Sequence, residues 1–485
     1  MPPRTAKRPR YRSPVAARVV SGTRAVPDST ESFVSAAKWL GGEGNDPRSA
    51  AEKRAEALLA SNRGLLQDFG VSAVVTRRGG EPGIMLQTST RIGAIPLLSP
   101  VSGRPDFGLV VEPRFTWSSA GEMLAGTGFR IVPELLPLPN LPQSERRVPP
   151  WVMSSIVLAR LNRLLDAMQR RFTVFEADLL APRGAVLWET YLNQRLPHGR
   201  ALSVPCRFPD LRDDDELKSA IKWVVRRHRD ALLGQTAAGI VVSQLLRICE
   251  ELLARLAGAQ AHLPSANRNS LWQRQPLATK VFREGLQAID WTVDERGLAG
   301  LSDLTGLAWR MDMDTFFEAW VESIAAKVAA RVGAQLRVGR REQTRVPLNW
   351  QPPSTGSQRS LLPDVVLQRS DTVVVIDAKY KRHAEQIERL GWHGADETLK
   401  EQHRADVLQA LAYSTLFDSP RVVACLAYPA APKDWDSLAA RNRVLFRARV
   451  GGGARCVELA LLSVPLSGAA DLPAQWLERL MREAA

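Results

Sequence analysis

The chain has 485 residues, a formal net charge of +14 and four cysteines. At about 100–200 residues per domain, this length suggests two or three domains. We find no apolar run near the roughly 18–20 residues that span a bilayer, and no apolar secretion signal. The cysteines lie far apart and form no CxxC pair, which argues against a disulfide scaffold and a structural zinc site. These features exclude membrane and disulfide-rich secreted proteins and favour a reduced, cytoplasmic protein.

Much of the positive charge lies at the N-terminus. Residues 1–27 carry seven arginines and lysines and no acidic residue. We predict that 1–27 is a basic disordered tail, either a flexible nucleic-acid arm or a solubilising segment. The remaining residues still carry a surplus of +7 (14 − 7). A basic surface that attracts a phosphate backbone is therefore expected even without the tail.

The hydrophobic pattern predicts four further segments. Residues 28–70 read as a helical segment with Gly70 as a C-cap, and 71–150 as a β-rich module that ends in a proline-rich linker. Apolar residues at helical spacing predict a mostly helical region over 151–300. Residues 301–485 alternate between helix and strand patterns, which predicts an α/β domain around a central mixed sheet.

The strongest chemical signal is the segment LLPDVVLQRSDTVVVIDAKYK, at 361–381. It reads as two strands of a hairpin, with Asp364 at the start of the first strand and Asp377 and Lys379 on one face of the second. Two neighbouring carboxylates repel each other unless a cation lies between them, and oxygen ligands suit Mg²⁺, with Mn²⁺ as the alternative. Such a metal can activate a water and stabilise charge on a phosphate, while the lysine assists. The competing interpretation is a solvated hairpin with ordinary surface charges.

This spacing resembles the PD-(D/E)xK nuclease superfamily, and the flanking segments strengthen the resemblance. The segment 311–328 reads as a helix with Asp314 as its N-cap. In the superfamily such a helix often supplies another acidic residue, which Glu318 matches, so the resemblance implies Glu318 as a third metal ligand. Glu322 lies one turn further on the same face. The helix that follows the hairpin would contribute Gln409 to the site, since related nucleases often carry a glutamine there.

Five blocks in order resemble McrC, the nuclease subunit of 5-methylcytosine-specific restriction systems. They are DMDTFFEAWV, LLPDVVL, VVVIDAKYK, DVLQALAYS and RVVACLAYP. The resemblance extends more weakly from about residue 90 to 430. It implies a restriction-endonuclease-like fold for the C-terminal domain. One departure is an acidic run at 213–216 in place of the family's usual asparagine.

The resemblance also implies a two-component system for antiviral defence. The subunit would cleave double-stranded DNA with Mg²⁺ and stimulate a separate AAA+ GTPase motor, the McrB-like partner. The chain contains no GxxxxGK[ST] loop, in agreement with a motor on another polypeptide. Docking on the motor would involve residues 71–150, with Arg114 as a candidate contact. Two alternatives are a repair nuclease of the same fold and a non-catalytic activator of an AAA+ ring; self-association stays open.

Overall fold

The computed structural model of the protein divides into two compact units. It describes residues 22–41, 47–142, 149–168, 171–212, 214–264, 272, 279–294, 305–352, 356–450 and 456–482. The first unit comprises Met1–Glu112, Leu135–Glu145 and Asp303–Arg310; the second comprises Pro113–Glu134, Arg146–Ser302 and Met311–Ala485. Helices and strands are mixed in the chain, so the predicted α/β class is confirmed. Among the described residues, no helix is both long and apolar enough to cross a membrane.

Among the described residues, the first unit contains a long helix and three small sheets. Their strand orders are β1-β6-β5-β13-β7, β2-β4-β3 and β12-β8. The helix α2 (Pro47–Phe69) and strand β3 (Val71–Arg78) fall where the sequence predicts them, and Gly70 between them has a φ of +81°. The other elements are β1 (Gly22–Pro27), β2 (Glu31–Ser35), α1 (Ala36–Leu40), β4 (Glu81–Thr88), β5 (Arg91–Leu97), β6 (Phe107–Glu112), β7 (Glu134–Leu135), β8 (Leu141–Pro142), β12 (Thr305–Gly306) and β13 (Trp309–Asp312).

The start of the chain differs from the prediction. Residues 22–27 were expected to belong to a disordered tail, yet they form β1, which pairs in parallel with β6. Strand β2 likewise lies in the segment predicted to be helical. The pairing partner of β1 lies more than 80 residues away, at Phe107–Glu112. A local charge pattern carries no information about such a distant partner. The rest of the predicted tail, residues 1–21, lies outside the described residues.

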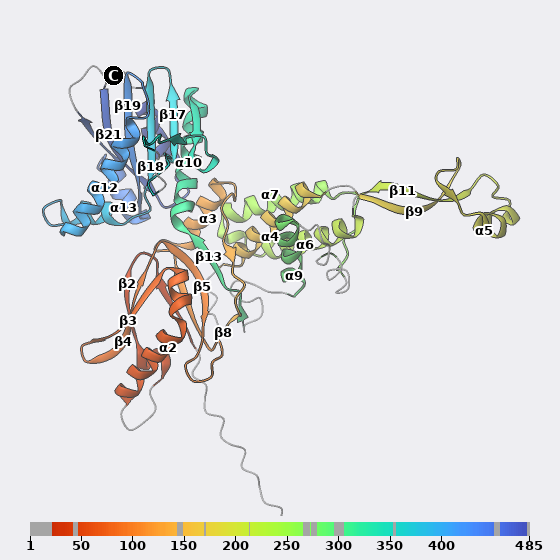
Figure 1. The fold of residues 1–485 in the computed structure, drawn as a ribbon, viewed down its shortest axis with the longest axis horizontal. Helices are drawn as coiled ribbons and strands as arrows, with labels where there is room; N and C mark the ends of the chain where they lie inside the picture. The colour runs from red at the N-terminus through yellow and green to blue at the C-terminus, as the bar shows by residue number, and fades with distance from the viewer. Residues whose placement is uncertain are drawn as a thin grey trace, which may run out of the picture. The chain divides into compact units, whose positions relative to one another are not determined.

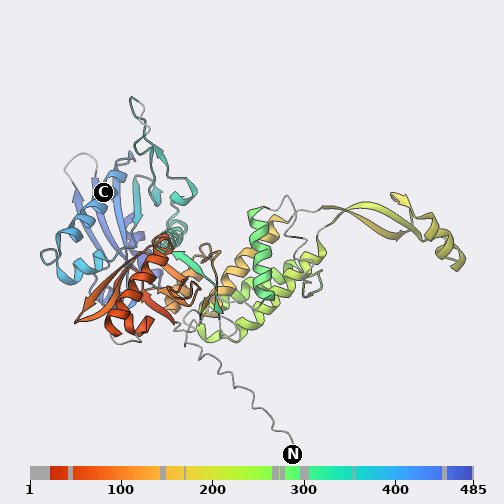
Figure 2. The same cartoon turned by 60° about the horizontal axis from the view of Figure 1, so that its bottom comes forward.

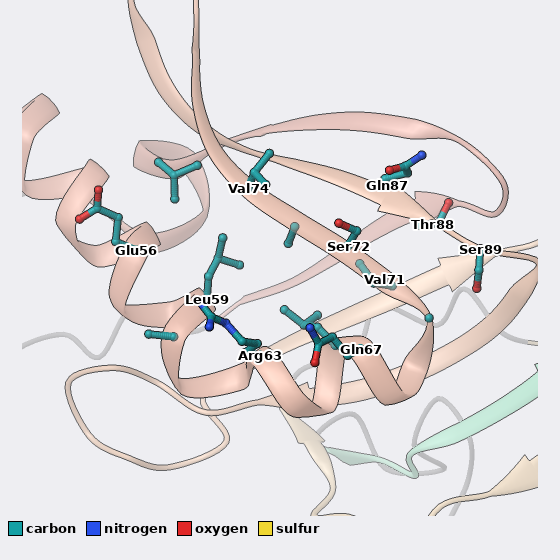
Figure 3. Close-up of a pocket in the computed structure, with 15 residues that line it drawn as sticks. Glu56, Leu59, Arg63, Gln67, Val71, Ser72, Val74, Gln87, Thr88 and Ser89 are labelled. Carbon is teal, nitrogen blue, oxygen red and sulfur yellow. The ribbon is translucent and has the colours of Figure 1, made fainter. Parts of the chain in front are cut away.

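A shallow hollow of about 790 Å³ lies between α2 and the edge strand β3. Figure 3 shows Arg63 and Gln67 of α2 on one side and Val71, Ser72 and Val74 of β3 on the other. The unpaired edge of β3 leaves backbone groups open on this side. Part of the region predicted to dock on a motor therefore offers a concave, mixed polar and apolar surface.

The middle of the second unit is mostly helical, as predicted. Figure 2 shows its long helices side by side. A long hairpin of β9 and β11 interrupts them and carries short helical turns at its end (Figure 1). The elements are α3 (Trp117–Gly126), α4 (Pro150–Ala167), β9 (Arg171–Leu179), β10 (Ala185–Val186), α5 (Trp188–Thr190), η1 (Tyr191–Arg195), η2 (Leu196–His198), β11 (Val204–Arg212), α6 (Asp215–Leu233), η3 (Thr236–Ala238), α7 (Ile240–Arg255) and α9 (Lys280–Val293).

The C-terminal part of the second unit is built around a six-stranded mixed sheet of order β14-β17-β18-β19-β21-β20 (Figure 1). Strands β17 and β18 are antiparallel, whereas β18, β19 and β21 run parallel. The predicted mixed sheet and hairpin are confirmed. The elements are α10 (Met313–Val332), β14 (Gln335–Val338), η4 (Gly339–Arg341), β15 (Val346–Pro347), β16 (Ser360–Leu361), β17 (Val365–Arg369), β18 (Thr372–Ala378), α11 (His383–Leu390), α12 (Glu397–Ser414), β19 (Arg421–Ala430), α13 (Pro432–Ala440), β20 (Leu445–Val450), β21 (Cys456–Pro465) and α14 (Asp471–Arg482).

Helices cover both faces of this sheet. Tyr413 of α12 packs on Val373 and Val375, which alternate along β18 and therefore share one face. Leu426, which pairs with Asp377 across β18 and β19, belongs to the same helix-covered face. On the opposite face, Arg421 donates a hydrogen bond to the carbonyl of Leu480 in α14. The sheet is thus the middle layer of three, and Asp377 lies at the end of its α12 face.

The core under α12 provides a direct test of this packing. Leu426→Ala is expected to lower the free energy of unfolding by about 2–5 kcal/mol, because Leu426 is fully buried and its truncation leaves a cavity. Leu408→Ala on the outer side of α12 is the matched control, since Leu408 is 66% exposed. Its effect should stay within about 0.5 kcal/mol. Urea unfolding followed by circular dichroism measures both; equal effects would contradict the assigned face.

Candidate active site

The register of β17 and β18 brings Asp364 and Asp377 together. Val365 pairs with Ile376, so the next pair in this antiparallel ladder sets Asp364 opposite Asp377. The backbone N–H of Ala378 donates a 2.8 Å hydrogen bond to Oδ2 of Asp364 and holds this carboxylate at the strand end. Asp377 is only 2% exposed. Two acidic side chains therefore meet at a largely buried end of the hairpin, as the sequence predicts.

Lys379 lies beside this pair. Its Nζ donates a hydrogen bond to Oδ1 of Asp377 at 3.1 Å and lies 2.9 Å from Oδ2. Burial would lower the pKa of Lys379, but the charge of Asp377 and the hydrogen bond to it raise the pKa above its usual value. The backbone N–H of Lys379 donates to the carbonyl of Ala427 in β19, so the sheet fixes its position. The lysine is therefore a fixed positive charge within the site.

Burial raises the pKa of both carboxyl groups. Burial, followed by the charges of Asp377 and Glu318, raises the pKa of Asp364 to about 8. Burial also raises the pKa of Asp377, although Lys379 opposes the shift. The two groups titrate as a coupled pair, because one carboxylate disfavours the ionisation of the other. Without a further positive charge, the site holds a proton that ordinary aspartates would lose.

Glu318 lies on α10 and reaches the same electrostatic environment. Burial, followed by repulsion from Asp314, raises its pKa to about 7, and Lys379 is among the charges that oppose this shift. Its own charge contributes to the raised pKa of Asp364. The cap of α10 corrects one detail of the prediction: the side chain of Asp312, not Asp314, accepts the N–H of Thr315 at 3.1 Å. The helix therefore begins two residues earlier than expected, at Met313.

Glu322, one turn after Glu318, is engaged elsewhere. Its carboxylate is 2% exposed and forms ion pairs with Arg130, Arg340 and Arg341. A carboxylate bound by guanidinium groups is not available to a metal. The choice between Glu318 and Glu322 was not visible in the sequence, because their helical spacing places both on one face. The structure distinguishes the two residues, because three arginines form ion pairs with Glu322.

Gln409 reaches the site indirectly. Its side chain is exposed, and its Nε2 donates a 2.9 Å hydrogen bond to the hydroxyl of Tyr413. Tyr413 is 6% exposed; burial raises its pKa, and the charges of Asp377 and Asp364 raise it further. Tyr413 therefore lies in the field of both aspartates, and Gln409 orients it. Gln409 and Tyr413 lie on one face of α12, as predicted, but Tyr413 is the residue that points into the core.

The buried acidic residue Asp406 of α12 was not predicted as part of the site. It is 3% exposed, and its Oδ1 lies 2.6 Å from Nζ of Lys381. Its Oδ2 accepts a 3.2 Å hydrogen bond from the hydroxyl of Tyr428, which itself lies 3.4 Å from Nδ1 of His403. The charge of Asp406 also raises the pKa of Asp377. The sequence held one sign of this: an aspartate interrupts the apolar residues on the inner face of the helix.

Arg114, the candidate docking contact, lies beside Tyr380. Its guanidinium lies 4.4 Å from the ring centroid of Tyr380, which is 1% exposed, and its guanidinium nitrogens are buried. Tyr380 also contacts the ring of Phe317 on α10. Arg114 is therefore a partly buried residue that packs on Tyr380 within the second unit. The sequence could not show this, because the two residues are more than 260 positions apart.

The donor set agrees with a hard divalent cation. Oδ2 of Asp377 is buried and accepts no hydrogen bond from the described residues, although the Lys379 ammonium lies nearby. Among those residues, no three His, Cys, Asp or Glu side chains form a ready metal site, so Glu318 does not complete a three-carboxylate group. Mg²⁺ commonly uses only one or two carboxylates and keeps several waters. Asp364 and Asp377 suit this mode of binding.

Comparison with protein families gave one match. Residues 295–429 match the family described as McrBC 5-methylcytosine restriction system component. The McrC-like resemblance is therefore confirmed over this segment. The comparison with curated proteins gave no match.

Two solved structures from Thermococcus gammatolerans are similar to the chain. A half-complex of McrB AAA+ hexamers with bound McrC is 14% identical, covers 94% of this chain and 99% of its own, and has a TM-score of 0.40. A McrBC complex is 13% identical, covers 63% and 88% respectively, and has a TM-score of 0.26.

The raised pKa of Asp364 predicts a pH dependence of stability. Between about pH 4 and about pH 8 the folded protein retains a proton that the unfolded chain has lost. The free energy of unfolding should therefore fall as the pH rises through this range. We expect the Tm in EDTA to fall in the same way, and Asp364→Asn, which keeps an acceptor for Ala378, to reduce the fall. An unchanged pH profile in this variant would contradict the assignment; Asp371→Asn at the exposed turn is the control.

Proposed function

We propose that this chain is the endonuclease subunit of a modification-dependent restriction system of the McrBC type. It hydrolyses phosphodiester bonds in double-stranded DNA with Mg²⁺, or with Mn²⁺ as an alternative, on a restriction-endonuclease-like PD-(D/E)xK domain. One observation carries this proposal: the buried pair of Asp364 and Asp377 with Lys379 beside it at the end of the β17–β18 hairpin. The family match over 295–429 supports it.

Each residue has a role in this mechanism. Asp364 and Asp377 would hold the cation, and Glu318 would adjust the charge of the site from α10. When bound, the cation supplies positive charge that favours ionisation of the attacking water and offsets charge on the phosphate. Lys379 orients that water and stabilises the negative charge that develops on the phosphate oxygens. Hydrolysis adds hydroxide to phosphorus, breaks one P–O bond and leaves the proton on the departing sugar oxygen.

The proposed partner is a separate AAA+ GTPase that moves on DNA. One similar T. gammatolerans structure contains McrB AAA+ hexamers with bound McrC, and the other is a McrBC complex. This chain carries no phosphate-binding GxxxxGK[ST] motif, so nucleotide hydrolysis is assigned to the partner. Docking is assigned to residues 71–150, where the hollow between α2 and β3 is a suitable surface. Recognition of the modified base is assigned mainly to the partner.

Cleavage should depend on the hairpin carboxylates. Asp377→Asn, assayed with the AAA+ protein of a neighbouring gene, GTP and Mg²⁺ on methylated and unmethylated DNA, is expected to lower the cleavage rate at least 100-fold, a loss typical of removing a principal electrostatic group. Asp371→Asn on the same hairpin should retain activity, because Asp371 is exposed at the turn. GTP hydrolysis by the partner should persist with both variants. Cleavage at the parental rate by Asp377→Asn would refute the proposal.

Metal binding can be measured without cleavage. A cation that binds only the folded state stabilises it, by about 2.7 kcal/mol at a concentration of 100 times Kd. Mg²⁺ or Mn²⁺ should therefore raise the Tm of the parental protein, and EDTA should reverse the change. Asp364→Asn and Asp377→Asn should lose this response, while Asp371→Asn keeps it. An undiminished response in both site variants would place the cation elsewhere.

A further inference from the structure

Three arginines converge on the buried carboxylate of Glu322. Nη1 of Arg130 lies 2.9 Å from its Oε1, Nη2 of Arg341 lies 3.3 Å from the same oxygen, and Arg340 binds Oε2. Arg130 comes from the segment after α3, whereas Arg340 and Arg341 belong to η4. A single carboxylate offsets one of the three positive charges. The cluster therefore carries a surplus of two (3 − 1).

The surplus positive charge faces solvent. The side chains of Arg130 and Arg341 are each 55% exposed and that of Arg340 is 27% exposed, whereas that of Glu322 is only 3% exposed. One arginine would suffice to pair a buried carboxylate. Three guanidinium groups held together repel one another, and a partner rich in anionic oxygens relieves this repulsion. Guanidinium groups match phosphate oxygens well, because they donate paired hydrogen bonds in a fixed plane.

The arginine cluster is tied to the strand that presents Asp364. Strand β14, which leads into η4, pairs with β17. The N–H of Gly339 donates a 2.8 Å hydrogen bond to the carbonyl of Asp364, and the hydroxyl of Thr344 donates to the carbonyl of Pro363 at 2.5 Å. A Cβ on Gly339 would lie 2.5 Å from the Pro363 carbonyl oxygen, so the close approach requires glycine. The turn with the arginines and the catalytic strand end thus form one connected structure.

We propose that Arg130, Arg340 and Arg341 form a phosphate-binding cluster that holds the DNA backbone next to the scissile phosphate. Glu322 is its positioning residue: it is buried, contacts no substrate and fixes the guanidinium groups. The cluster adds a substrate-binding surface to the proposed nuclease and rests on that proposed function. The cluster also acts on the proposed active site, since the charge of Arg340 lowers the pKa of Glu318. Cation and substrate are therefore bound by separate side chains on α10 and its neighbours.

The test measures DNA binding by the full chain with a fluorescent DNA duplex in Ca²⁺, without nucleotide. The variant combines Arg130→Gln with Arg341→Gln and leaves Arg340 to pair Glu322. Each phosphate contact contributes about 0.9 to the slope of log affinity against log salt, so the slope should weaken by about two. The affinity should fall roughly ten-fold at moderate salt. An unchanged Tm will show that the variant is folded.

The matched control combines Arg163→Gln with Arg247→Gln. These side chains are 51% and 73% exposed, and each forms an ion pair with a glutamate, so the control removes the same charge from a similar setting. We expect it to lose much less affinity than the cluster variant. Equal losses in the two variants, or no loss in the cluster variant, would overturn the proposal.

The variant Glu322→Gln distinguishes two effects on DNA binding: the positioning of the arginines by Glu322 and the net charge of the protein. It adds one net positive charge, so non-specific attraction alone would tighten DNA binding. If Glu322 fixes the arginines, binding should instead weaken in the variant that remains folded; tighter binding would overturn its positioning role. These measurements do not depend on cleavage. Failure of the cluster variant to change binding would leave the Asp377→Asn result intact, whereas parental cleavage by Asp377→Asn would refute the nuclease assignment itself.

Discussion

The repulsion between Asp364 and Asp377 is the constraint on which the rest of the site depends. The antiparallel register places them opposite each other, and neither side chain can move far away, because Asp377 lies at the buried end of its strand. Like charges opposite each other weaken a strand pair. The two aspartates nevertheless lie opposite each other. Lys379 supplies only one positive charge to offset the two carboxylates. Burial raises the pKa of both carboxyl groups, and the charge of Asp377 raises that of Asp364 further. In the proposed mechanism a divalent cation would neutralise the pair, so the proposed chemistry depends on the strand register.

The surrounding elements keep this pair at a fixed place. Helix α12 covers the face on which Asp377 lies, and its inward residues carry two functions: Tyr413 fills the core, while Asp406 binds Lys381 and Tyr428 beyond the strand end. The ion pair between the buried Asp406 and the more exposed Lys381 fixes the position of Lys381 more than it stabilises the fold, since the cost of burying the Asp406 carboxylate offsets much of the attraction. The two lysines after β18 are thus each held by a different aspartate.

The sequence predicted the parts of the site that depend on local pattern. The hairpin, the pairing of Asp364 with Asp377 and the position of Lys379 follow from alternation along two adjacent strands. The family of the region followed from five ordered blocks and is confirmed. The sequence missed what depends on distant partners: the pairing of β1 with β6, the burial of Arg114 over Tyr380, and the arginines that occupy Glu322. Glu318 and Glu322 have the same local pattern, and only their three-dimensional neighbours distinguish them.

Helix α10 carries two carboxylates whose surroundings differ in charge. Glu318 faces the aspartate pair and adds negative charge to a place that attracts a cation. One turn later, Glu322 is surrounded by guanidinium groups, and its environment is net positive. A nuclease needs both fields close together, because its substrate is a polyanion and its cofactor a cation. If both carboxylates were equally exposed, their charge would repel the DNA that the metal must reach. The arginines that cover Glu322 remove that repulsion and make the net charge around it positive. The acidic site therefore lies beside a surface that attracts phosphate.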